Sequence, residues 1–196
     1  MTEIELSAFD FETDRLRLRP LQEGDEALFH GLYTNLDTMR FICPPLSSEQ
    51  AAARFPKIVA QQRKPSLKGR FLVILDKVTR QAVGICGTSQ YDAGALRLEV
   101  GIVLTPEARA QGVAREALTA LMKRIFVASP VNEIWARFSA ENLTAMQLVV
   151  SVGFSPCADA LRENGGAKTY HYSLHRSSSS AIETTNCQGA GNVERN

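Results

Sequence analysis

The chain has 196 residues, of which 44% are hydrophobic and 22% charged, and its 22 Lys and Arg against 21 Asp and Glu leave a net charge of +1. This length suits one domain with a sizeable core, and near neutrality excludes binding driven by net charge alone, such as a broad basic groove for nucleic acid. No apolar run approaches the roughly 18 residues of a membrane helix. Neither nucleic acid nor a membrane is therefore an expected partner.

Residues 1–11 are acidic and lack the basic region of an export signal. The four cysteines, Cys43, Cys86, Cys157 and Cys187, are too widely spaced for a C-x-x-C motif. We therefore expect free thiols and a cytoplasmic location. His171 and His175 share one face of a predicted strand that we expect to be solvated, and without a third ligand they predict no metal site.

The first third of the chain predicts one strand and two helical regions. Leu16 and Leu18 alternate with arginines before Pro20, which indicates a half-buried strand. Residues 22–36 have helical spacing. Ser47 and Gln50 have the spacing of a capping box at the start of another helix, in which Pro56 predicts a kink or a break.

The middle of the chain predicts an antiparallel meander, because residues 70–75, 82–89 and 96–104 are apolar segments joined by short turns. The last of these segments alternates strictly, which predicts a strand with two different faces. One face holds Leu96, Leu98, Val100, Ile102 and Leu104. The other face holds Arg97, Glu99, Gly101 and Val103.

A helix over 110–127 and a strand over 133–139 follow, and together with the strand before them they predict a parallel strand–helix–strand crossover. A helix over 142–152 and a strand over 168–175 come last. The fold class is therefore a mixed α/β (α+β) sheet of about seven strands, antiparallel in its N-terminal part, with helices on both faces. We expect a short extension at 1–11, one domain at 12–175 and a disordered tail at 176–196, which has a serine run and no aromatic residue.

The segment VLTPEARAQGVARE at 103–116 is the most informative for function. A strand ends, a short loop follows, and a helix begins near Gly112, so unpaired N–H groups and the helix dipole would form an anion site. Gly112 allows close approach of a phosphate, and Arg109 and Arg115 flank the loop. The alternative is an ordinary loop with a solvated face. Neither the G-x-x-x-x-G-K-[ST] nor the G-x-G-x-x-G motif is present, which disfavours ATP and dinucleotides.

Residues 109–114, RAQGVA, resemble the R/Q-x-x-G-x-G/A motif of the GNAT acetyltransferases. The strand EVGIVL at 99–104 and the segment NLTAMQLVVSVGF at 142–154 are similar to that family as well. TDRLRLRP at 13–20 resembles the opening of the branch that acetylates ribosomal-protein N-termini. The similarity spans about residues 12–175.

The resemblance implies direct transfer of an acetyl group from acetyl-CoA to a primary amine, either a protein N-terminus or a small amine metabolite or antibiotic. We expect no metal, and either a monomer or a homodimer. Phosphates would bind at residues 111–114, the pantetheine arm would lie along residues 102–104, and a backbone N–H near Val103 would stabilise the thioester oxygen. The implied cofactor-binding residues are Ile102, Val103, Leu104, Arg109, Gln111, Gly112, Val113, Ala114, Arg115 and Asn142.

Glu99 is the candidate catalytic base, and its alternative role is an exposed carboxylate paired with Arg97 or Arg137. Asn142 would contact pantetheine, cap its helix, or do both. The apolar loop 41–46 either lines the acceptor pocket or packs on the core. Ala145 replaces a serine of the family pattern, and no tyrosine occurs in residues 142–152. The second functional hypothesis is therefore a non-catalytic acyl-CoA-binding sensor or scaffold.

Overall fold

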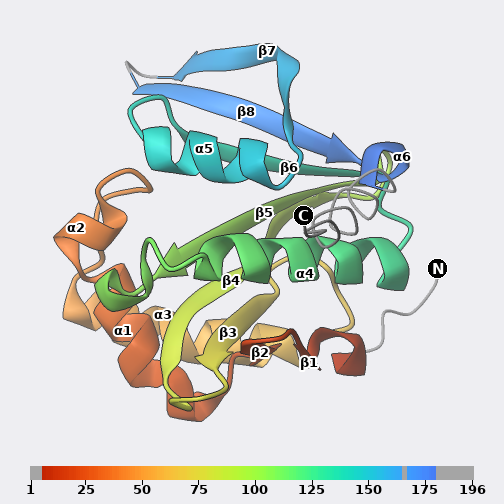
Figure 1. The fold of residues 1–196 in the computed structure, drawn as a ribbon. Coiled ribbons are helices and arrows are strands. Elements are labelled where there is room, and N and C mark those ends of the chain that lie inside the picture. Colours follow the sequence, from red (N-terminus) through yellow and green to blue (C-terminus); the bar gives the residue numbers. More distant parts are fainter. Residues whose placement is uncertain (1–5, 165–166, 180–196) are drawn as a thin grey trace, which may run out of the picture.

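The structure, a computed structural model, describes residues 6–164 and 167–179 (Figure 1). Within these residues it has eight strands: β1 (Phe11–Glu12), β2 (Leu16–Pro20), β3 (Phe71–Asp76), β4 (Ala82–Asp92), β5 (Arg97–Leu104), β6 (Glu133–Ser139), β7 (Ser155–Asn164) and β8 (Ala167–His175). The α-helices are α1 (Glu26–Tyr33), α2 (Leu36–Met39), α3 (Ser48–Gln62), α4 (Val113–Ala128), α5 (Leu143–Ser151) and α6 (Arg176–Ser179). Short 3₁₀ turns occur at Leu6–Phe9, Glu23–Asp25 and Pro106–Ala108.

The strands form one sheet in the order β1-β2-β3-β4-β5-β6-β8-β7. Only β5 and β6 are parallel among the described strand pairs, and α4 connects them. The mixed sheet with an antiparallel N-terminal part and a parallel crossover is therefore confirmed. The sequence did not predict β7, because its residues show little alternation; it pairs irregularly with β8.

Helices cover both faces of the sheet, as predicted (Figure 1). On one face α4 and α5 pack against a core that includes Leu98 and Val100. On the other face α1 and α3 pack against a second core with which Val103 is in contact. The alternation predicted for β5 is thus confirmed, except that Leu96 lies just before the strand with a φ of 51°.

The N-terminal helices differ in part from their prediction. The capping box is present, with the N–H of Gln50 donating to the Ser47 hydroxyl at 3.2 Å. Of the two alternatives predicted at Pro56, the break is wrong, since α3 continues through it, and the kink stays a prediction. Pro56 is exposed, so the carbonyl that it deprives of a partner can bond water. The region 22–36 divides into a 3₁₀ turn, α1 and the start of α2, which Asn35 caps.

Both ends of the described chain contribute to the domain. Phe9 lies in the segment expected to be an extension and is fully buried. At the other end, the Arg176 guanidinium donates to the carbonyls of Phe126, Ser129 and Val131, where α4 ends. Arg176 begins α6, whereas residues 180–196 of the predicted tail lie outside the described residues.

Candidate functional site

A gap in strand pairing opens the middle of the sheet. The parallel ladder between β5 and β6 runs from Arg97 opposite Glu133 to Glu99 opposite Trp135, and no pairs follow. β6 continues to pair with β8 as far as Ser139. The second half of β5 therefore has one free backbone edge. We call this gap in strand pairing, beside residues 100–104 of β5, the cleft.

The antiparallel ladder determines which backbone groups face the cleft. The N–H of Thr105 donates to the carbonyl of Val83 at 3.0 Å. Since backbone groups of successive strand residues point to opposite sides, those of Val103 face β4, and those of Ile102 and Leu104 face the cleft. The N–H that the sequence analysis placed near Val103 is thus offered by its neighbours rather than by Val103 itself.

The loop after β5 ends at a free helix N-terminus. Gly112 is the N-cap of α4, with a φ of 77° and no side-chain hydrogen bond to the helix. Backbone N–H groups of the first turn therefore have no partner within the helix. Val113 begins this turn with its side chain in the core, and Ala114 follows it. The predicted loop and helix start are present, and we call residues 109–112 the cofactor loop.

Arg109 is exposed, but its guanidinium is bonded to other parts of the protein. Its Nη2 donates to the Thr38 hydroxyl of α2 at 2.7 Å and to the Leu104 carbonyl at 3.3 Å. The Gln111 side chain turns back to donate to the carbonyl of Glu107. Arg115 is exposed on the first turn of α4. Both arginines predicted to flank an anion are thus exposed, and Arg109 is hydrogen-bonded to Thr38 and Leu104.

A third arginine reaches the cofactor loop from a distant part of the chain. Arg15 donates from Nη1 to the Gln111 carbonyl at 3.1 Å, and its Nη2 lies 2.7 Å from the Glu116 carboxylate. Thr13 also donates to Glu116, at 2.6 Å. Burial alone would raise the pKa of Glu116, but these bonds lower it below its usual value. The sequence pattern around Thr13 and Arg15 indicated a family resemblance but no role for either residue in the site.

Glu99, the candidate base, is only 7% exposed. It accepts a hydrogen bond from the Ser89 hydroxyl, and its Oε1 lies 3.6 Å from Nε of Arg137. Arg97 pairs instead with Glu133, at 2.9 Å. The alternative prediction, an exposed carboxylate paired with Arg97 or Arg137, is therefore wrong in that Glu99 is buried. Its pairing with Arg137 is present.

Asn142 caps α5, because its Oδ1 accepts from the N–H of Ala145 at 3.0 Å. This confirms one of its two predicted roles. The loop 41–46 is largely exposed, with Ile42 at 52%, while Leu46 packs partly against the α1–α3 core. Packing on the core is thus confirmed for Leu46, and the acceptor-pocket role of the loop stays a prediction.

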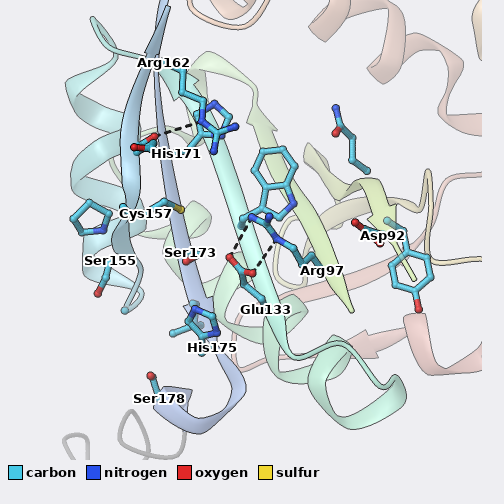
Figure 2. A pocket seen from close by; sticks show the side chains of 18 residues that line it. Asp92, Arg97, Glu133, Ser155, Cys157, Arg162, His171, Ser173, His175 and Ser178 are labelled. Carbon is cyan, nitrogen blue, oxygen red and sulfur yellow. Dashed lines mark hydrogen bonds and ion pairs between the residues drawn. The ribbon is translucent and has the colours of Figure 1, made fainter. Parts of the chain in front are cut away.

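A groove of about 770 Å³ is lined by residues of β4, β5, β6, β7 and β8, among them Arg97, Glu133 and His171 (Figure 2). Trp135 stacks on His171 at 5.6 Å between ring centroids, and the Arg97 guanidinium lies over the same indole. His171 is 8% exposed, so the expectation of a solvated face is wrong for it. Burial, then the charges of Arg162 and Arg137, lower its pKa.

Among the described residues, no three His, Cys, Asp or Glu side chains gather as a metal site would require. No described helix is long and apolar enough to cross a membrane. Cys43, Cys86 and Cys157 are free thiols. Cys187 lies outside the described residues.

Comparisons with known proteins agree with this geometry. The chain is 24% identical to an uncharacterized N-acetyltransferase p20 from Bacillus licheniformis over 143 residues, which are 72% of this chain and 80% of that protein. The spermidine N-acetyltransferase of Vibrio cholerae, solved with CoA and spermine, has the same fold, with a TM-score of 0.73, 21% identity, and coverage of 85% of this chain and 99% of that chain. So does the ribosomal-protein-S5-alanine acetyltransferase of Vibrio fischeri, with a TM-score of 0.71, 17% identity, and coverage of 85% and 96%. The model of the acetyltransferase (GNAT) domain matches residues 15–155, and the chain therefore belongs to the GNAT acetyltransferase family.

Proposed function

We propose that this protein is an acetyl-CoA-dependent N-acetyltransferase that transfers an acetyl group to a primary amine by direct attack in a ternary complex. The observation that supports this most is the free edge of β5 leading directly to the uncapped N-terminus of α4. A cofactor with an extended arm and a diphosphate at one end would need a free strand edge for the arm, followed by a helix N-terminus for the diphosphate.

The pantetheine arm would add to the sheet as a short strand along residues 102–104, because their cleft-facing backbone groups lack a partner strand. The diphosphate would bind the N–H groups of Gln111, Gly112, Val113 and Ala114. The site fits this group, since a Cβ at Gly112 would approach only Arg15, at 3.4 Å, leaving space above the loop. Arg115 and Asn142 would contact the bound cofactor from α4 and α5.

The reaction forms a C–N bond and breaks the thioester C–S bond. Once the ammonium has lost a proton, its nitrogen attacks the carbonyl carbon, and the N–H of Ile102 would stabilise the negative charge on the carbonyl oxygen. Glu99 would accept the proton as general base. The sulfur leaves with the bonding electron pair as CoA thiolate, and the nitrogen gives up its second proton to that thiolate or to water as the neutral amide forms.

The acceptor would approach on the face opposite α4 and α5, at the part of β5 that α1 and α3 leave exposed beyond Val103. Gly101 lies on the open face, two residues from Glu99, and it is exposed. Farther along this face, Glu99 and Glu133 are paired with Arg137 and Arg97. Because both carboxylates are already paired with arginines, we favour a singly charged amine, a protein N-terminus or a small monoamine, over a polyamine.

Thermal melts with and without acetyl-CoA test the cofactor site. A ligand at about 100 times its dissociation constant stabilises a protein by about 2.7 kcal/mol, which raises the Tm of a chain of this size by roughly 5–10 °C. Gly112→Asp should abolish that shift, because it places a negative charge in the anion site. Gly24→Asp, at an exposed glycine with open space around it, is the matched control and should keep the shift.

Absence of the shift in a folded wild-type protein would refute the proposed function. A shift without acetylation of any amine in a screen of peptides, monoamines and polyamines would favour the non-catalytic acyl-CoA sensor. Faster acetylation of spermidine than of a monoamine would contradict the acceptor class inferred above.

A further inference from the structure

The cofactor loop is strained and fastened at both ends. Ala110 has a φ of 58° and Gly112 one of 77°, and the left-handed conformation costs a residue with a Cβ roughly 1–2 kcal/mol. Such a conformation persists only where surrounding contacts impose it. Two arginines provide these contacts, Arg15 at the Gln111 carbonyl and Arg109 at Thr38 and Leu104.

The Arg109 contact joins two parts of the molecule that lie 71 residues apart in sequence. Thr38 is 9% exposed in α2, and its N–H is itself held by the Asn35 side chain at 2.8 Å. The next residue, Met39, is fully buried. α2 is therefore a fixed anchor, and the exposed loop 41–46 follows directly from it.

We propose that Arg109 is a positioning residue: through its bond to Thr38 it fastens α2 to the cofactor loop and couples the position of loop 41–46 to cofactor binding. The same nitrogen holds the Leu104 carbonyl at the cleft edge. One guanidinium thus joins the cofactor loop, the end of β5 and the element that leads to loop 41–46. Its role in cofactor affinity is indirect, because its side chain is engaged by the protein itself.

This inference rests on the proposed function only for the identity of the ligand, CoA. The effect of Arg109 on the conformation of the cofactor loop can be measured without a ligand. Thr38→Val removes the hydroxyl and keeps the shape of the side chain, whereas Thr38→Ser keeps the hydroxyl. The matched control is Thr34→Val, because the Thr34 hydroxyl bonds only to the His30 carbonyl in the preceding turn, at 2.8 Å. CoA binding by titration calorimetry and amide hydrogen exchange of residues 109–112 without ligand are the two measurements.

We expect Thr38→Val to raise the Kd for CoA about tenfold, the change expected from losing one hydrogen bond to a charged group. Exchange at residues 109–112 should become faster, while Thr38→Ser and Thr34→Val should behave as the wild type. In kinetics, Thr38→Val should raise KM for both substrates.

Unchanged CoA affinity and exchange in Thr38→Val would overturn the proposal. So would equal effects of Thr34→Val, since these would indicate a general loss of stability. If the wild type binds no CoA, the proposed function fails, and the exchange experiment still decides the role of Arg109.

Discussion

Gly101 offers the sharpest test of the direction from which the acceptor arrives. A Cβ at this position would meet no atom within 4 Å, and the residue is exposed in β5. A glycine inside a strand destabilises a protein by roughly 0.5–1 kcal/mol relative to alanine. Gly101→Ala should therefore raise the Tm by roughly 1–4 °C, and Gly101→Val should fold equally well.

The same substitutions should impair catalysis. The attacking nitrogen must come within about 3–3.5 Å of the thioester carbon, and a displacement of about 1 Å reduces the rate by about 100-fold. The valine side chain would occupy the space through which the amine approaches. We expect kcat/KM for the acceptor to fall about 100-fold in Gly101→Val, with a smaller loss in Gly101→Ala and cofactor affinity retained.

Steady-state kinetics, CoA titration and thermal melts on the same preparations measure these effects. Gly31→Ala is the matched control, because a Cβ there also meets nothing within 4 Å; it should stabilise α1 by up to about 1 kcal/mol without affecting the rate. A fully active Gly101→Val variant would show that the amine does not cross this face. An unfolded one would show that the space beside Gly101 is not open.

Three further predictions concern charge. Glu99→Gln should reduce kcat by roughly 100-fold or more, the usual contribution of a general base, at unchanged CoA affinity; retained turnover in a rate assay would exclude Glu99 as the base. Because the folded state lowers the pKa of His171, the unfolded chain binds more protons below about pH 6.5, and stability should fall as the pH decreases through this value. His171→Phe should reduce the difference in stability between pH 7.5 and pH 5.5, measured by urea unfolding. An unchanged difference would show that His171 does not cause it. Arg176→Ala should lower the free energy of unfolding by about 2–3 kcal/mol, since it removes charged hydrogen bonds to the end of α4; Arg176→Ala with wild-type stability in chemical denaturation would contradict this.

Local patterns determined most of the fold. The alternation along β5, the apolar stripe of α4 and the capping box at Ser47 each involve residues a few positions apart, so periodicity and short-range hydrogen bonding predict them. The cap at Asn142 and the glycine at the start of α4 belong to the same class. Pro56 does not break α3, because the effect of a proline inside a helix depends on its exposure, which the sequence does not show.

Tertiary structure decided what surrounds the site. Arg15 meets Glu116 across 101 positions and Arg109 meets Thr38 across 71, and no pattern within one segment specifies such pairs. The alternation along β5 is typical of a strand with Glu99 on an exposed face, yet Glu99 is buried and contacts Arg137 and Ser89. The sequence by itself thus determined the elements and the location of the loop that we propose binds the cofactor. Only packing between distant segments decided which charges are buried, paired or free, because burial depends on what lies opposite each face.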